Sequence, residues 1–135
     1  MKAIPTIGKY ITTVPQTIGA EQSLAKAEKV MTAGRIRHLP VLRGGQLVGI
    51  LSDRDVKLVE SFKDVDPEKV TVEEAYTPQP YITSPTASLA EVCAEMAANK
   101  YGCVLVCDNR KLVGIFTWVD ALKAFDELLS TRLKH

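Results

Sequence analysis

The stretch that decides the fold is Leu47–Asp55, which reads LVGILSDRD, and the same pattern returns as LVGIFTWVD at Leu112–Asp120. A shift of 65 residues aligns the two stretches, and the sequence around them, without a gap. Over residues 15–60 against 80–125, 12 of 46 aligned positions are identical, where about 3 are expected by chance. The chain is therefore predicted to consist of two tandem repeats.

Each repeat predicts the order strand, helix, strand, strand, helix. The first helix of each repeat is amphipathic, with Leu24 and Met31 at helical spacing in one and Leu89 and Met96 in the other. Gly34 is the expected helix stop. Strands are expected at residues 39–43 and 46–51 around a two-residue turn, and at 103–107 and 111–116 around a three-residue loop at 108–110. Closing helices are expected from residues 52 and 117 onward.

The domain boundaries follow the repeat. We expect a first unit at residues 6–62, a linker with a lead-in helical turn at 63–79, a second unit at 80–129 and a tail at 130–135. Thr71–Glu74 fits a capping box and predicts the helical turn, which matches residues 6–11 of the first repeat. A unit of about 60 residues buries little surface alone, so the two sheets are expected to stack and to leave a ligand cleft between the units.

Composition excludes several classes of protein. The 135 residues are 46% hydrophobic and carry a net charge of +1, which disfavours both intrinsic disorder and a nucleic-acid binder that relies on phosphate contacts. No apolar run is long enough for a membrane helix and no secretory signal is recognisable, so we expect a cytoplasmic protein without DNA or membrane partners. The three cysteines form no CxxC pair and are interpreted as reduced core residues.

The strand-to-helix junctions carry Ser52 and Thr117, each followed three residues later by an aspartate, Asp55 and Asp120. One interpretation is structural, because Ser/Thr-x-x-Asp caps a helix N-terminus. The other is functional: a helix start with a hydroxyl suits an anion, and the aspartate suits the two hydroxyls of a ribose. Together these features point to a nucleotide.

A basic cluster precedes the first hairpin and includes Arg37 and His38. It is either a solvated loop in which Pro40 starts an edge strand, or part of a nucleotide site. In the second interpretation Ile36 and Leu39 flank an adenine while Arg37, His38 or Arg54 reaches the phosphates. The equivalent stretch at residues 101–106 has lost the basic residues and the proline, so two such sites would differ in affinity or in ligand.

Catalysis has little support, since no Ser-His-Asp, HExxH, GxGxxG or P-loop pattern occurs. The two histidines are His38 and His135. Asp55 and Asp120 form a conceivable carboxylate pair, but each has a better role as a cap. Trp118 is either an aromatic anchor for a partner or a cover for the second pocket. No metal site is predicted.

These residues resemble a tandem pair of CBS (cystathionine-β-synthase) domains, also called a Bateman module, over residues 6–127. The resemblance rests on residues 36–41, on residues 47–55 and on their repeats, and the first repeat is similar to small stand-alone CBS proteins of the acetoin-utilisation type. It implies an α+β fold of two β-α-β-β-α units packed sheet to sheet with pseudo-twofold symmetry. It also implies two clefts for AMP, ADP, ATP or S-adenosylmethionine, and commonly a homodimer.

Carried over by position, the resemblance implies that Asp55 and Asp120 bind ribose and that Ser52 and Thr117 contact phosphate. Two adenine pockets are implied, one lined by Thr17, Ile36, His38, Leu39 and Pro40, the other by Ile82, Tyr101, Gly102, Cys103 and Val104. The second repeat departs from the pattern with Leu105 for the proline and Trp118-Val119 for Asp53-Arg54. The Asp55 site is therefore the first choice.

We expect a non-catalytic regulatory module that binds an adenine nucleotide, requires no cofactor and signals to an effector protein on another chain. The alternative is a structural dimerisation or scaffold module with no physiological ligand. An enzyme ranks third.

Overall fold

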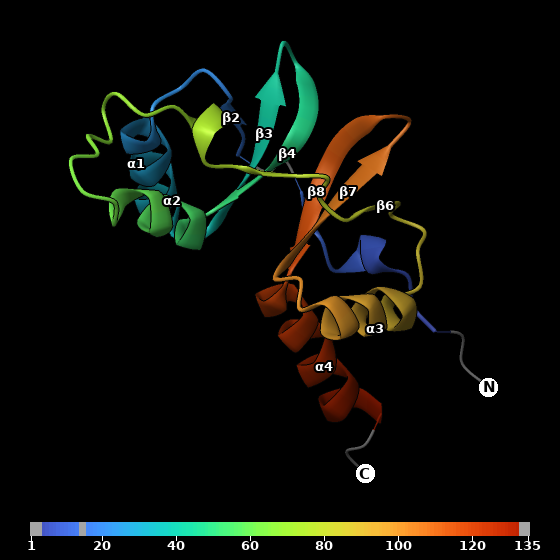
Figure 1. The fold of residues 1–135 in the computed structure, drawn as a ribbon. Helices are drawn as coiled ribbons and strands as arrows, with labels where there is room; N and C mark the ends of the chain where they lie inside the picture. Colours follow the sequence, from blue (N-terminus) through green and yellow to red (C-terminus); the bar gives the residue numbers. More distant parts are fainter. Residues whose placement is uncertain (1–3, 14–15, 133–135) are drawn as a thin grey trace. The chain divides into compact units, whose positions relative to one another are not determined.

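The computed structural model describes residues 4–13 and 16–132 (Figure 1). The chain forms two compact units. We call residues 16–80 the Asp55 unit, and residues 4–13 together with 81–132 the Asp120 unit. Each unit combines one four-stranded sheet with two α-helices, which confirms the predicted α+β class. No helix in the described ranges is both long and apolar enough to cross a bilayer.

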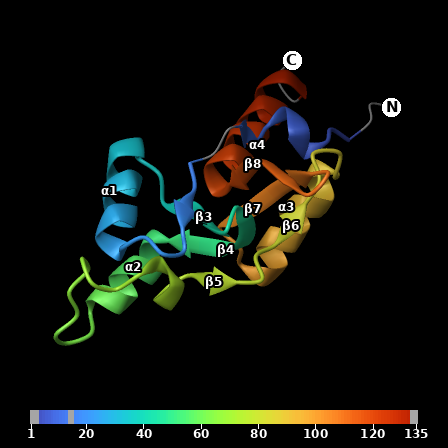
Figure 2. The ribbon, with the colours of Figure 1, turned by 90° about the horizontal axis from the view of Figure 1, so that it is seen from above.

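The Asp55 unit contains the expected strand, helix, strand, strand, helix order and adds a short helical turn and an edge strand. Its elements are β2 (Ile18–Gly19), α1 (Leu24–Gly34), β3 (His38–Arg43), β4 (Gln46–Ser52), α2 (Asp53–Glu60), η2 (Val72–Glu74) and β5 (Thr77–Pro78). The sheet order is β2-β3-β4-β5. Strands β2 and β3 run parallel and the other pairs antiparallel. Helices α1 and α2 lie side by side (Figure 2).

The Asp120 unit repeats this arrangement. Its elements are η1 (Ile7–Lys9), β1 (Thr12–Thr13), β6 (Ile82–Thr83), α3 (Leu89–Asn99), β7 (Cys103–Asp108), β8 (Lys111–Thr117) and α4 (Trp118–Arg132). The sheet order is β1-β8-β7-β6. Helix α4 continues into the expected tail as far as Arg132, and residues 133–135, with His135, lie outside the described residues.

Each unit has its own hydrophobic core. In the Asp55 unit the helix face predicted from Leu24 and Met31 packs against Leu39 and Leu51 of the central strands. In the Asp120 unit Leu89 and Met96 belong to a second cluster built around the fully buried Phe116, and the two clusters share no residue. The amphipathic pattern therefore identified the buried faces of both helices correctly.

One local expectation is confirmed and one was wrong. Helix α1 ends at Gly34 as expected, and the left-handed residue that follows is Arg35 (φ 54°), whose N–H caps the helix end. The second hairpin has a two-residue turn rather than a three-residue loop, because Asp108 pairs with Lys111. Asn109 and Arg110 take the positive φ angles that this turn requires.

Two lead-in segments, residues 6–11 and 71–74, each precede one repeat in the sequence but pack on the other repeat. Ile7 is fully buried in the core of the Asp120 unit, and Val72 is fully buried in that of the Asp55 unit. Strand β1 pairs with β8, and β5 pairs with β4. The compact units therefore differ from the expected ranges 6–62 and 80–129. The sheet of the Asp120 unit has its edge strand β1 before the first repeat in the sequence, and the sheet of the Asp55 unit has its edge strand β5 before the second.

This pairing explains the glycine in each LVGI stretch. A Cβ atom on Gly114 would lie 2.8 Å from the carbonyl oxygen of Thr12, and one on Gly49 would collide with the backbone of Thr77. Only glycine lets the edge strands approach so closely.

Candidate functional site

The predicted capping box at the start of α2 is confirmed. The Ser52 hydroxyl accepts a hydrogen bond from the Asp55 N–H, and the Ser52 N–H donates to Oδ2 of Asp55, both at 3.0 Å. The reciprocal pair satisfies two of the free donors at a helix start. One oxygen of the Asp55 carboxylate, Oδ2, therefore has a structural role.

The second oxygen of this carboxylate, Oδ1, takes no part in the capping box. The Thr77 hydroxyl of β5 also donates to Oδ2, at 3.3 Å, whereas Oδ1 accepts no hydrogen bond from the described residues. Asp55 is half-buried. An oriented carboxylate with one available oxygen is suited to accept hydrogen bonds from ligand hydroxyls.

The basic residues lie beside this carboxylate. His38 pairs with Ser52 across the β3–β4 ladder, and the Asp53 N–H donates to the Arg37 carbonyl at 2.9 Å. The Arg37 and Arg54 side chains are exposed, and that of His38 is half-buried. The structure therefore brings Arg37, His38 and Arg54 to the N-terminal end of α2, as the site hypothesis requires.

Burial lowers the pKa of His38 below its usual value of 6.5. The carboxylates of Asp53 and Asp55 act in the opposite direction and raise the pKa, while the positive charges of Arg37 and Arg54 lower it further. Near neutral pH the imidazole is thus neutral, and a bound anion would favour its protonation.

The lowered pKa predicts a pH effect on stability. Between the folded-state pKa of His38 and 6.5, the unfolded chain binds more protons than the folded chain, so the free energy of unfolding rises with pH across this window. Denaturant titrations at pH 7.5, 6.5 and 5.5 are expected to show a loss of stability on acidification that is smaller in His38→Gln. An equal loss in both proteins would contradict this role for His38.

The second carboxylate, Asp120, is more completely engaged. Oδ2 accepts hydrogen bonds from the Thr117 N–H at 2.8 Å and the Thr117 hydroxyl at 3.2 Å, and Oδ1 accepts one from the Thr12 hydroxyl at 3.3 Å. Asp120 is only 6% exposed. With both oxygens occupied, it is less available to a ligand than Asp55.

Aromatic residues lie at the N-terminal end of α4, the helix that carries Asp120. The Trp118 indole N–H donates to the Tyr101 carbonyl at 2.8 Å, and the rings of Tyr101 and Tyr81 lie 5.5 Å apart. Burial, with a smaller contribution from the charge of Asp120, raises the pKa of the Cys103 thiol to about 12. Cys103 is therefore protonated and is neither a nucleophile nor a thiolate ligand.

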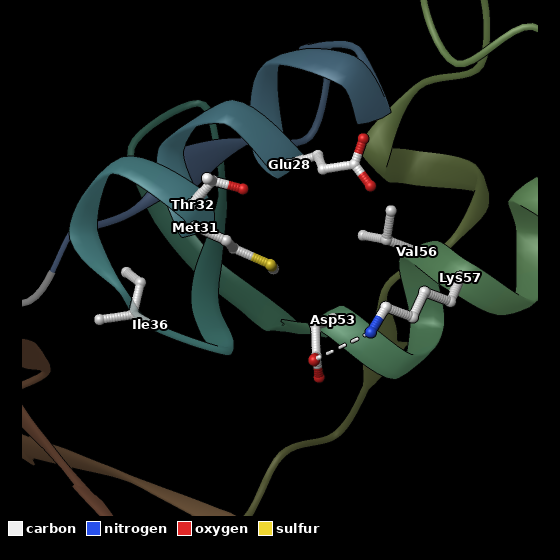
Figure 3. Close-up of a pocket in the computed structure, with 7 residues that line it drawn as sticks. All are labelled: Glu28, Met31, Thr32, Ile36, Asp53, Val56 and Lys57. Carbon is white, nitrogen blue, oxygen red and sulfur yellow. Dashed lines mark ion pairs between the residues drawn. The ribbon is translucent and has the colours of Figure 1, made fainter.

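A shallow pocket of about 170 Å³ lies between α1 and α2 (Figure 3). It is lined by Glu28, Met31, Thr32, Ile36, Asp53, Val56 and Lys57. Lys57 reaches Asp53 at 3.9 Å on its rim. Ligand pockets usually enclose at least about 300 Å³, so this pocket alone does not hold a nucleotide. Within the described ranges, no group of three or more His, Cys, Asp or Glu residues is arranged to hold a metal ion.

Comparison with known proteins places this geometry in a family. The CBS domain model matches the sequence twice, at residues 7–60 and 72–127. The chain belongs to the CBS-domain family. Among curated proteins, it is 28% identical over 105 residues to the CBS domain-containing protein YhcV of Bacillus subtilis. The aligned region covers 78% of this chain and 74% of YhcV.

Two solved CBS structures are close in fold. A putative acetoin utilization protein (AcuB) from Vibrio cholerae has a TM-score of 0.86, 26% identity and 98% coverage of both chains. The CBS domain pair of protein MJ0100, solved with 5′-methylthioadenosine and S-adenosyl-L-methionine, has a TM-score of 0.83 and 26% identity, with 93% of this chain and 98% of that chain covered. Some relatives are much longer: the chain spans 24% of the inosine-5′-monophosphate dehydrogenase of Staphylococcus epidermidis, to which it is 26% identical.

The structure divides the predicted CBS site residues between the two units. The Asp55 unit holds Thr17, Ile36, Arg37, His38, Leu39, Pro40, Ser52, Arg54 and Asp55. The Asp120 unit holds Ile82, Tyr101, Gly102, Cys103, Val104, Thr117 and Asp120. Leu39 and Val104 are fully buried in the cores, so in this structure neither residue presents surface to a ligand.

Sequence reasoning missed two residues at these predicted sites, Thr12 and Thr77. The Thr12 hydroxyl donates a hydrogen bond to Asp120, and the Thr77 hydroxyl donates one to Asp55. The same 65-residue shift that revealed the repeat aligns Thr12 with Thr77, and this coincidence was the available signal. Their role depends on the exchanged edge strands, which the alignment does not show.

Proposed function

We propose that this CBS-domain chain is a non-catalytic regulatory module that binds an adenosine nucleotide, first of all at Asp55. The observation that carries the proposal is the Asp55 carboxylate, held by Ser52 and Thr77 through Oδ2 and open at Oδ1. The hydroxyls of a ribose would donate to Oδ1. The MJ0100 pair, with two adenosine ligands, supports this ligand class.

The charges beside Asp55 favour a phosphorylated ligand. Arg37, Arg54 and a protonated His38 would neutralise one phosphate group, and guanidinium groups match phosphate geometry. Thr17 and Ile36 are the side chains proposed to contact the adenine. Thr17 immediately precedes Ile18, which pairs with Val41, so it lies at the level of Pro40 on the neighbouring strand.

For the Asp120 site we propose an adenosine ligand without phosphate groups. The positions equivalent to Arg37 and His38 are Gly102 and Cys103, and the aromatic rings of Tyr81 and Tyr101 lie nearby. Aromatic faces attract neutral purines and cationic sulfonium groups more than phosphates. Binding at either site would stabilise one conformation and so signal to an effector chain.

One observation favours the alternative, a scaffold module with no physiological ligand. Asp55 and Asp120 each form hydrogen bonds with the protein itself at a helix start. A cap alone would account for their presence.

Thermal unfolding separates the two functions. AMP, ATP, adenosine and S-adenosylmethionine are added separately, with GMP as the control nucleotide. A ligand at 100 times its Kd stabilises the folded state by about 2.7 kcal/mol. We expect AMP or ATP to raise Tm more than adenosine and GMP to have little effect. If no adenosine ligand shifts Tm, the scaffold function stands instead.

A further inference from the structure

The Trp118 side chain connects two segments of the Asp120 unit. Its indole N–H donates a hydrogen bond to the carbonyl oxygen of Tyr101 at 2.8 Å. Trp118 is the first residue of α4, and Tyr101 lies in the loop that joins α3 to β7. The side chain therefore bends back from the helix start and reaches this loop, although it remains 60% exposed.

The equivalent segments of the Asp55 unit are those to which the phosphate group is assigned. Under the 65-residue shift Trp118 aligns with Asp53, and Tyr101 aligns with Ile36. In that unit the helix start and the loop meet through the backbone, because the Asp53 N–H donates to the Arg37 carbonyl at 2.9 Å. The Asp53 carboxylate lies 3.9 Å from Lys57 (Figure 3), so it turns along the helix rather than toward the loop.

The charges at the two helix starts differ as well. Three cationic positions of the first repeat align with uncharged residues in the second, as follows: Arg37 with Gly102, His38 with Cys103 and Arg54 with Val119. A phosphate group beside Trp118 would therefore meet an apolar indole instead of guanidinium groups. It would give up hydrogen bonds to water without gaining charged partners, which is unfavourable.

The fold of the Asp120 unit does not require the indole. Phe116, two residues earlier, is fully buried in the core, whereas most of Trp118 is exposed. The helix start is already capped, because Asp120 accepts hydrogen bonds from the Thr117 N–H and hydroxyl. At the equivalent position of α2, a small polar residue, Asp53, suffices. Neither packing nor capping therefore explains a tryptophan at this position.

We propose that Trp118 is a specificity-determining residue of the Asp120 site. Its indole covers the position equivalent to that of the phosphate group at the Asp55 site, and so the site admits adenosine compounds whose 5′ group is uncharged or cationic. Thioether and sulfonium groups suit this position, because aromatic rings attract both sulfur and cations. The inference rests on the proposed function, since it takes adenosine binding at the Asp120 site as given.

The hydrogen bond of Trp118 is testable without any ligand. The chain contains a single tryptophan, so its indole N–H gives one resonance in a ¹⁵N–¹H NMR spectrum. We expect this N–H to exchange with water about tenfold more slowly than the indole of free tryptophan, because it is bonded to the Tyr101 carbonyl. An exchange rate equal to that of free tryptophan overturns the proposed arrangement.

Calorimetric titrations in an Asp55→Ala background test the selectivity of the Asp120 site by itself. We expect 5′-methylthioadenosine to bind about tenfold more tightly than AMP, and Trp118→Ala to bring the two Kd values within about threefold of each other. Trp118→Phe keeps an aromatic ring without the donor and is expected to give an intermediate ratio. The matched control is Val119→Ala, which changes a neighbouring residue that is 59% exposed and is expected to keep the tenfold preference. Unchanged thermal unfolding of Trp118→Ala shows that the variant folds.

The outcomes distinguish this inference from the proposed function. If the wild type binds neither AMP nor 5′-methylthioadenosine, the proposed function fails and the inference fails with it. If the wild type binds them but Asp55→Ala does not bind 5′-methylthioadenosine, or binds AMP equally well, only the inference is overturned. The same holds if Trp118→Ala keeps the full preference for 5′-methylthioadenosine. A Trp118→Phe variant as selective as its Trp118 parent overturns the role of the hydrogen bond.

Discussion

Replacement of Asp55 by alanine is expected to weaken AMP binding by about 100-fold, whereas Asp120→Ala has a much smaller effect. In the proposed complex the Oδ1 atom of Asp55 accepts hydrogen bonds from ribose hydroxyls, and a hydrogen bond to a charged group contributes about 1.5–3 kcal/mol. A loss of about 2.8 kcal/mol corresponds to that change in Kd. Both oxygens of Asp120 already have partners within the protein. Its removal is therefore expected to reduce the binding free energy of a ligand by less.

Calorimetric titration of the two variants makes this comparison directly. Asp55 also caps α2, and loss of a cap costs about 1 kcal/mol of stability, so binding is measured well below each variant's Tm. Thr77→Val serves as an intermediate variant, because it removes one hydrogen bond to Oδ2 and leaves the carboxylate in place. Equal losses in Asp55→Ala and Asp120→Ala, or a loss only in the latter, would reassign the nucleotide site.

Local features of this site were predictable because they depend on neighbours in the sequence. The cap between Ser52 and Asp55 spans three residues, and the basic pair Arg37 and His38 enters a strand whose partner is fixed by a two-residue turn at Gly44. The hydrophobic spacing gave the buried faces of α1 and α3 for the same reason. Short-range geometry leaves few alternatives once the element type is known.

The exchange of the lead-in segments was not predictable from the repeat. The shift aligns Ile7 with Val72, but the alignment does not show in which unit's hydrophobic core each side chain packs. Chain connectivity offers a physical reason: the segment after α2 needs to close only a short loop to return Val72 to the unit it has just left. The equivalent position in the Asp120 unit is then filled by Ile7, which precedes the whole Asp55 unit in the sequence.

This exchange predicts that Ile7→Ala destabilises the Asp120 unit by about 3 kcal/mol, although Ile7 lies outside the second repeat in sequence. Ile7 is fully buried among the side chains of that unit, and removal of a buried isoleucine side chain typically costs 2–5 kcal/mol. Ile4→Ala is the matched control, because Ile4 is 61% exposed. Denaturant titration gives the size of the loss.

Hydrogen exchange shows which unit is affected. In Ile7→Ala we expect the amides of β7 and β8 to lose protection, while those of β3 and β4 keep it. Val72→Ala is expected to give the opposite pattern, since Val72 belongs to the core of the Asp55 unit. Loss of protection in β3 and β4 of the Ile7 variant would contradict the exchanged packing. The same variant links stability to the site, because η1 and β1 carry Thr12 to Asp120, so loosening this segment removes a hydrogen bond from that carboxylate.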